Sequence, residues 1–420
     1  MRVLATLTTY PPSTGGAQLH AHLLHQQLRG RDVDVHVATW WRDTRTDWAL
    51  GTTLRAPPPR PDEVLDGVPV HHLGLTVGQR LAAGAALAAY PPAMRTVAPA
   101  LVAPWAPAAR RVVDRVAPDV LHLSRIGREW PYQAVVRAAR ARGVGYVLTP
   151  NHHPHWTRPW HWWWWELYRH ANVVLVLSDA EAEQLVAGGV ERDRIVRTVV
   201  GPVGAAADVD LAARPPAPDD PPTVAFLGQV RRYKGIEVLH AAMQRVWVDR
   251  PEVRLVVVGP WLDADEWVRR ALAADPRVDL LGAVDEDVKW DVLRRCTLLC
   301  VPSEGEALGG VYLEAWTVGR PCVGADIPPV AELMARTGGG VAVARDPDVL
   351  ATTLRGLLDD PERCAALGLA GRAAVAAEYR WDVAAERAAG AYERAVAEGP
   401  RPGARSAQPR PRAARTRRRT

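Results

Sequence analysis

The chain has 420 residues, of which 48% are hydrophobic and 24% are charged, and its formal net charge is +5. This length is too great for one ordinary domain, so we expect two domains. The composition is not that of a disordered chain, and every apolar run of 18 residues is interrupted by Pro or a charge, which excludes a membrane-spanning helix.

Short β-rich runs alternate with helical stretches throughout the chain, which predicts parallel sheets with crossover helices. In the first half we expect strands at 3–9, 33–39, 68–74, 120–124, 146–151, 173–178 and 195–201. In the second half we expect them at 223–228, 254–259, 278–282, 297–302, 321–326 and 340–344. A Pro-rich stretch at 56–63 reads as a loop, and helices near 361–377 and 382–397 close the chain.

The first strand leads into a loop with Gly15 and Gly16 and then a helix. Such glycines either let the backbone approach a phosphate or mark a plain turn. We expect His20 and His22 on the helix surface. His22 and His25 share a helical face but have no apparent carboxylate partner, so no metal pair is predicted.

The strand at 146–151 runs directly into Asn151, His152 and His153. No Asp, Glu or Cys stands near these histidines, so a zinc site is not predicted. Six Trp follow within residues 156–165, and four of them are consecutive. Consecutive residues cover every face of a helix, so we expect some of these Trp to contact an acceptor or a membrane surface rather than the core.

Residues 205–222, AAADVDLAARPPAPDDPP, lack any periodicity and read as an interdomain linker. The segment FLGQVRRYKGIEVL (226–239) then follows a strand and opens a helix. Lys234, with Arg231 or Arg232, would place positive charge at that turn, where it could stabilise a group that gains negative charge.

Residues 302–324, PSEGEALGGVYLEAWTVGRPCVG, place Glu306 eight positions before Glu314, with Gly309 and Gly310 between them. This reads as strand, Gly-rich turn, helix and strand. The amino end of the helix would bind an anion. Two carboxylates beside an anion site suit hydroxyl groups rather than phosphates, so the pattern indicates a nucleotide-sugar site.

This segment resembles the donor-site signature of the retaining family-4 glycosyltransferases of the GT-B fold. The resemblance extends to about residue 398 and is closer in the second half of the chain. It implies an α/β fold with two Rossmann-like domains facing across a cleft and a C-terminal helix that crosses back to the first domain. We expect the N-terminal acceptor-binding domain at 1–203, the linker at 204–222, the C-terminal donor-binding domain at 223–380, the crossover helix at 381–398 and a disordered basic tail at 399–420.

The resemblance implies a retaining, hexosyltransferase-like enzyme of carbohydrate biosynthesis that transfers a sugar from a nucleoside-diphosphate sugar. Glu306 would hold sugar hydroxyls together with N–H groups near Leu308 and Gly309, and Glu314 would hold the ribose. Lys234 would contact the diphosphate, and the backbone around Val284 would pair with the base. Gly15, Gly16 and Gly310 would also contact the donor.

Three positions depart from the family's pattern. Gln229 stands where an Arg is usual, Val203 where a Gly is common, and Asn151 where a catalytic His is usual, so either Asn151 or His153 would act near the sugar. A degenerate GT-B protein that binds nucleotide sugars as a scaffold subunit is the alternative. A phosphorylase would need a cofactor lysine motif that we do not find in the sequence.

The resemblance implies no metal and no cofactor besides the donor, and a glycan or lipid-linked acceptor as partner. The start of the chain lacks the features of a signal peptide and the four Cys lack ligand spacing, so we expect reduced cysteines and a cytoplasmic protein. The last 20 residues carry eight Arg and no acid. This tail is either unbound or a contact to anionic lipid at the inner membrane face, and nucleic acid is not the expected partner.

Overall fold

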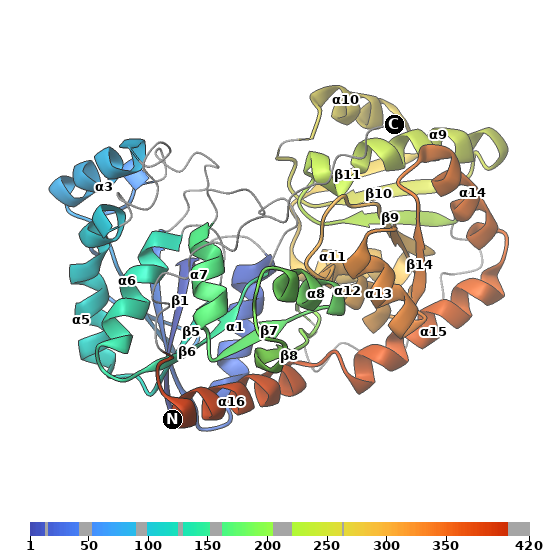
Figure 1. Ribbon diagram of the computed structural model, residues 1–420. Coiled ribbons are helices and arrows are strands. Elements are labelled where there is room, and N and C mark those ends of the chain that lie inside the picture. Colours follow the sequence, from blue (N-terminus) through green and yellow to red (C-terminus); the bar gives the residue numbers. More distant parts are fainter. Residues whose placement is uncertain are drawn as a thin grey trace, which may run out of the picture.

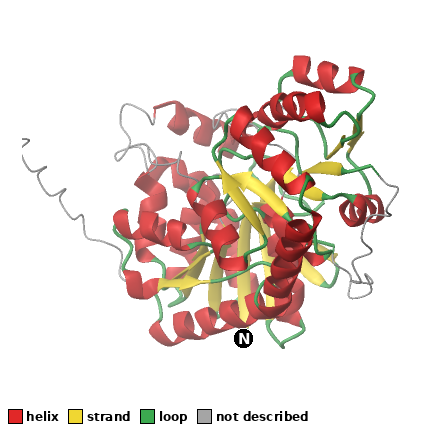
Figure 2. Ribbon diagram, turned by 90° about the vertical axis from the view of Figure 1, so that its right-hand side faces the viewer, coloured by secondary structure: helices red, strands yellow, loops and turns green. Residues whose placement is uncertain are grey.

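The computed structural model describes residues 1–12, 16–41, 53–89, 99–124, 129–151, 162–204, 221–262 and 264–401. Within these residues the chain forms two mainly parallel sheets that are each flanked by helices (Figure 1, Figure 2). We call residues 1–204 the N-terminal half and residues 221–380 the C-terminal half. Both halves therefore have the layered α/β architecture that the sequence predicts.

The first sheet has the strand order β3-β4-β2-β1-β5-β6-β7-β8, and the second has the order β11-β10-β9-β12-β13-β14. The strands of the first sheet are β1 (Arg2–Thr9), β2 (Asp34–Trp41), β3 (Glu63–Leu65), β4 (Val68–His72), β5 (Val120–Ser124), β6 (Gly145–Thr149), β7 (Val173–Val176) and β8 (Ile195–Arg197). The strands of the second sheet are β9 (Thr223–Leu227), β10 (Arg254–Val258), β11 (Val278–Gly282), β12 (Leu298–Val301), β13 (Cys322–Ala325) and β14 (Gly340–Val343).

The helices of the N-terminal half are α1 (Gly16–Arg29), α3 (Val77–Ala89), η1 (Ala103–Trp105), α5 (Ala106–Val116), α6 (Glu129–Arg140), α7 (Trp162–His170), α8 (Asp179–Ala187) and η4 (Arg192–Arg194). Those that follow are η5 (Arg232–Lys234), α9 (Ile236–Asp249), α10 (Glu266–Ala274), α11 (Glu286–Arg295), α12 (Gly310–Thr317), α13 (Pro328–Thr337), α14 (Pro347–Leu358), α15 (Pro361–Ala377) and α16 (Trp381–Glu398).

Local sequence explains these elements. Every residue of β1 after Arg2 is buried, as expected for a central parallel strand covered on both faces. Helix α5 buries Ala109, Val112, Val113 and Val116, which recur at helical spacing and form one apolar stripe. The predicted strands are therefore found, but the Pro-rich region at 56–63 ends in β3, a short antiparallel edge strand that the sequence analysis did not predict.

In both sheets the chain first adds strands on one side of a central strand and then continues on its other side. Strands β2 and β5 flank β1 in the first sheet, and β10 and β12 flank β9 in the second. Connections that leave such a point in opposite directions open a crevice at the carboxyl ends of the strands. The turns after β9 and β12 therefore lie where an open α/β sheet binds its ligand.

The last helix returns to the N-terminal half, as predicted, and lies along its lower edge in Figure 1. The hydroxyl of Tyr392 lies 2.8 Å from Nδ1 of the buried His122 on β5. Asn172 Nδ2 donates to Glu398 Oε2 at 3.0 Å. Helix α16 thus covers the face of the first sheet that α1 also covers, and the two helices pack against each other.

The histidines of α1 contradict the expected surface position. His22 and His25 are buried, and their Nδ1 atoms lie 2.8 and 3.1 Å from the hydroxyl of Tyr10. His22 Nε2 also lies 2.9 Å from Asp66, a carboxylate partner that the sequence analysis did not find. The expectation was wrong because this face of α1 packs onto the first sheet, against Tyr10 after β1 and Asp66 in the turn between β3 and β4. Among the described residues no cluster of potential metal ligands is present.

The two halves also touch directly through α8 and α13. Glu332 on α13 accepts hydrogen bonds from the backbone N–H groups of Asp179 and Ala180, at 2.9 and 3.0 Å. These N–H groups lie at the amino end of α8, where they have no acceptor within the helix and where a carboxylate is favoured. Leu177 and Val199 extend the apolar core of the C-terminal half into the N-terminal half.

All four cysteines are reduced and buried, as expected, and burial raises the pKa of the Cys296 thiol to about 12. Within the described part of the chain, none of the helices combines the length and apolar character needed to cross a bilayer.

Candidate functional site

Two turns at the carboxyl ends of β9 and β12 form the core of the candidate site. The first turn holds η5 and ends at Gly235, whose φ of 81° is the left-handed conformation that glycine adopts without strain. A Cβ on Gly235 would also overlap the carbonyl of Pro302 in the second turn. Glu304 N donates to Tyr233 O at 2.7 Å, so the two turns are joined by their backbones.

Lys234 and Glu306 meet where these turns join. Lys234 Nζ lies 2.5 Å from Glu306 Oε1, and the hydroxyl of Ser303 donates to the same oxygen at 2.7 Å. Both charged side chains are largely buried. Burial alone would lower the pKa of Lys234, but the Glu306 carboxylate raises it overall, so the lysine stays charged.

Glu314 lies inside α12, which begins one residue after Gly309, and its side chain is buried. Its Oε2 is 3.1 Å from Nζ of Lys289 on α11. The same ammonium group contacts Glu286 Oε2 at 2.7 Å and donates to the carbonyl of Val203 at 3.1 Å. These three acceptors match the three N–H donors of a lysine.

Lys289 is a site residue that the sequence analysis missed. In the sequence, Lys289 is one of several charged residues in a segment that reads as an exposed helix. Its distance along the chain from Glu314 does not indicate that the two side chains meet. Ser303 could have been predicted from the sequence as a site residue, because it belongs to the Pro-Ser pair that precedes Glu306. Burial raises the pKa of Glu314 to about 7, and the nearby Lys289 limits that rise.

The two predicted arginines contact other side chains, although the charge of Arg231 acts on Lys234 and lowers its pKa slightly against the larger effect of Glu306. Arg231 Nε donates to Gln229 Oε1 at 3.2 Å, so the Gln in the usual Arg position engages the arginine two residues later. Arg232 lies 2.5 Å from Asp265, and 70% of its side chain is exposed. Lys234 is therefore the predicted cation that contacts Glu306 in the structure.

The remaining predicted donor residues lie around α12 and α11. Leu308 is buried in the turn before α12, and Gly309 and Gly310 form the amino end of that helix. Val284 lies between β11 and α11 and packs partly against the core. Trp290, expected to be a packing residue, is buried on α11.

On the N-terminal side, Gly16 is the first residue of α1. Asn151 follows β6 with a φ of 46° and lines a cavity of about 40 Å³ together with His20, Thr149 and Trp381. Gly15, His153, Trp156 and Trp160 lie outside the described residues. The four consecutive Trp begin α7, where Trp165 is half-buried and packs against the core of the N-terminal half.

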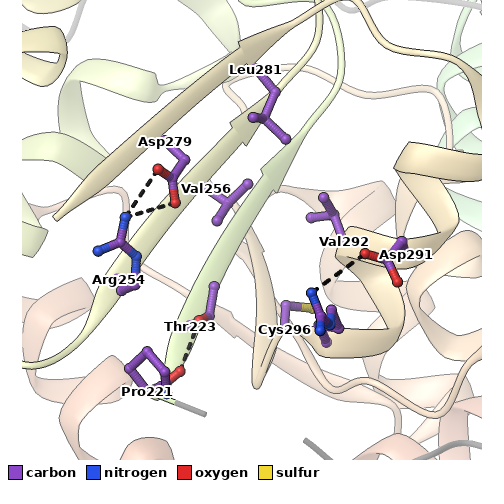
Figure 3. A pocket seen from close by; sticks show the side chains of 10 residues that line it. Pro221, Thr223, Arg254, Val256, Asp279, Leu281, Asp291, Val292 and Cys296 are labelled. Atoms are coloured by element: carbon purple, nitrogen blue, oxygen red, sulfur yellow. Dashed lines mark hydrogen bonds and ion pairs between the residues drawn. The ribbon is translucent and has the colours of Figure 1, made fainter.

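A wider cavity of about 270 Å³ lies elsewhere, near the amino ends of β9 and β10 (Figure 3). Its wall includes Arg254, which forms two hydrogen bonds with Asp279 at 2.9 and 3.0 Å. This cavity is at the opposite end of the strands from Lys234 and Glu306. We therefore assign it no part in the candidate site.

Comparison with known families agrees with this geometry. The family described as "Glycosyl transferases group 1" matches residues 210–374, and the one described as "Glycosyl transferase 4-like domain" matches residues 15–201. HepE of Anabaena in complex with UDP and glucose superposes with a TM-score of 0.66 at 16% identity, over 93% of this chain and 99% of that one. Sucrose-phosphate synthase of Thermosynechococcus elongatus superposes with a TM-score of 0.68 at 18% identity, over 94% and 99% of the two chains.

Two curated relatives are more similar in sequence. A GDP-mannose-dependent monoacylated alpha-(1-6)-phosphatidylinositol monomannoside mannosyltransferase of Corynebacterium glutamicum is 32% identical over 40% of this chain and 46% of its own length. A D-inositol 3-phosphate glycosyltransferase of Segniliparus rotundus is 32% identical over 42% of this chain and 40% of its own. The chain thus spans about half the length of the curated relatives it matches.

The fold is that of a GT-B protein, and the turns of the candidate site lie in the C-terminal half. The chain belongs to the family-4-type glycosyltransferases, with a 4-like domain followed by a group 1 domain.

Proposed function

We propose that this protein transfers a sugar from a nucleoside-diphosphate sugar to an acceptor hydroxyl, with retention of the anomeric configuration and without a metal ion. The observation that carries this proposal is the contact of Lys234 with Glu306 beside the amino end of α12, with Glu314 buried further along the same helix. One cation, one helix amino end and two carboxylates supply the groups that a charged diphosphate and two sets of hydroxyls require.

In the proposed reaction, Lys234 and the amino end of α12 bind the diphosphate and stabilise the negative charge that it gains on leaving. Glu306 accepts hydrogen bonds from the donor sugar, and Glu314 accepts them from the ribose. The bond from the anomeric carbon to the diphosphate oxygen breaks, and the acceptor oxygen bonds to that carbon from the same face. A phosphate oxygen takes the acceptor proton, so no nucleophilic side chain is needed.

The test is a thermal-shift screen of the wild-type protein with UDP, GDP and their hexose conjugates, followed by a transfer assay. GDP-mannose and inositol phosphates belong in the screen because relatives carry those compounds in their names. Binding at a hundred times Kd stabilises the native state by about 2.7 kcal/mol, which raises the melting temperature. If no nucleoside-diphosphate sugar shifts the melting temperature, the proposal is wrong.

A second candidate function is a binding subunit without transfer activity. It is favoured by Gln229, which replaces an expected cation and engages Arg231. The transfer assay separates the two functions, because a binding subunit would bind the donor without either transfer or hydrolysis.

Replacing Lys289 with Met should shift the pH dependence of nucleotide binding. Glu314 must be ionised to accept ribose hydrogen bonds, so wild-type affinity should rise as the pH increases through about 7, the pKa of Glu314. Without the nearby cation that pKa should rise further, by about one to three units. Calorimetric titration with the nucleotide from pH 6 to 9 measures the shift.

Lys289→Arg is the control, because it keeps the charge and should keep the wild-type profile. The two contacts of Lys289 with Glu286 and Val203 would also be lost in Lys289→Met, so the melting temperature must be compared as well. An unchanged pH profile in a folded Lys289→Met protein would contradict the role given to Lys289 and Glu314.

We also propose that the Arg-rich end of the chain, residues 401–420, brings the protein to anionic membranes. Each basic residue near such a surface contributes about 1 kcal/mol, and salt screens the attraction. A chain truncated after residue 400 should lose salt-sensitive co-sedimentation with phosphatidylserine vesicles but keep transfer to soluble acceptors. Equal sedimentation of both proteins would leave the tail without this role.

A further inference from the structure

The amino end of the donor helix α12 lies close to His20, a residue of α1 in the N-terminal half. Gly310 is the first residue of α12, and a Cβ built on it would lie 3.2 Å from Cε1 and 3.3 Å from Nε2 of His20. Carbon atoms prefer separations of about 3.5 to 4.0 Å, so a side chain at Gly310 would require the His20 ring to shift by a few tenths of an ångström. The sequence analysis expected His20 on the helix surface, but it is half-buried at this junction.

The His20 ring also lies near Trp381, the first residue of α16. The two ring centroids are 5.7 Å apart with an interplanar angle of 56°. Trp381 is itself fixed, because its Nε1 donates to the carbonyl of Pro202 at 2.9 Å. A Cβ on Gly201 would lie 2.6 Å from this indole. Movement of the His20 ring toward α16 is therefore limited by an indole that is itself held in place.

These contacts lie where the chain passes between the halves. Residues 201–204 end the N-terminal half, and α16 brings the chain back beside them. One helical turn after His20, Leu24 packs against the apolar cores of both halves. The face of α1 that carries His20 and Leu24 is thus one of the surfaces that contact the C-terminal half.

We propose that His20 is a positioning residue that sets how closely the amino end of α12 approaches the N-terminal half. The inference rests on the proposed function, because the distance matters through the diphosphate site at α12. His20 lies close to Gly310 and to Trp381, and Trp381 in turn donates a hydrogen bond to Pro202. A change in the size of either neighbour therefore moves the donor helix relative to the acceptor side.

The charge state of His20 agrees with this role. Burial lowers the pKa of His20 to about 4, so the ring is neutral at physiological pH. A neutral ring can lie against the amino end of a helix, whereas an imidazolium would be repelled by the positive end of the helix dipole.

The test is a double-mutant cycle of Gly310→Ala and His20→Ala in the full-length protein. Gly310→Ala should weaken the binding of UDP or GDP, whichever the wild type binds, by about tenfold, because the new methyl group meets the His20 ring. In the His20→Ala background the same change should cost less than about twofold, because the space has been opened. Gly390→Ala is the control, since nothing lies within 4 Å of that Cβ on α16.

The melting temperatures of the same variants are also measured without any nucleotide. This measurement tests the contact independently of the proposed function. If the wild type binds no nucleoside diphosphate, the proposed function fails, and the melting temperatures still test the contact. Destabilisation by Gly310→Ala that is relieved by His20→Ala supports the positioning role. An equal effect of Gly310→Ala in both backgrounds, in affinity and in melting temperature, overturns it.

Discussion

Replacing Glu306 with Gln should reduce sugar transfer by a factor of at least about a hundred while the protein remains folded. The amide keeps the shape of the carboxylate and can still accept hydrogen bonds from Lys234 and Ser303. It loses the negative charge that strengthens hydrogen bonds from the donor sugar, and such charge-assisted bonds are about twice as strong as neutral ones. Initial rates with the donor found in the screen measure the loss, and circular dichroism checks the fold.

Glu304→Gln is the matched control for this experiment. Glu304 lies two residues away in the same turn, but its side chain is 57% exposed and lies 3.9 Å from Arg345 rather than against Lys234. It should retain nearly full transfer activity. Wild-type turnover in Glu306→Gln would show that the site has been assigned to the wrong carboxylate.

Replacing Lys234 with Ala should weaken binding of the free nucleoside diphosphate and slow transfer by about a hundredfold or more. In the structure, Lys234 is the predicted cation that reaches Glu306, since Arg231 and Arg232 are engaged with Gln229 and Asp265. Removing it should therefore leave the departing diphosphate without its nearest positive side chain. Arg270→Ala on α10, where the side chain is 80% exposed, should have little effect.

Loss of the lysine also leaves Glu306 as a buried carboxylate without its cation, which destabilises a folded protein. The double variant Lys234→Ala with Glu306→Gln removes that charge and should recover the melting temperature without recovering transfer. Changing Gln229 to Arg could restore part of the diphosphate affinity of Lys234→Ala. Equal diphosphate affinity in wild type and Lys234→Ala would contradict the role of this lysine.

Some residues of the candidate site could be predicted from the sequence, and others could not. Glu306, Lys234 and Ser303 lie in short turns that directly follow buried strands, and their spacing is visible in the sequence. In contrast, the engagement of Arg231 by Gln229 depends on the direction of side chains within one turn. Spacing does not fix that direction, so the sequence left the choice between Arg231 and Arg232 open.

The sequence by itself determined the alternation of strands and helices, the Gly-rich turns and the carboxylates at the start and inside of α12. These features depend on periodicity and turn chemistry, which act between residues close in the chain. Only the tertiary structure decided that Lys289 pairs with Glu314, that His22 and His25 are buried against Tyr10, and that His20 lies near both Gly310 and Trp381. Such contacts join separate elements, and they depend on how helices cross and on where the chain passes between the two sheets.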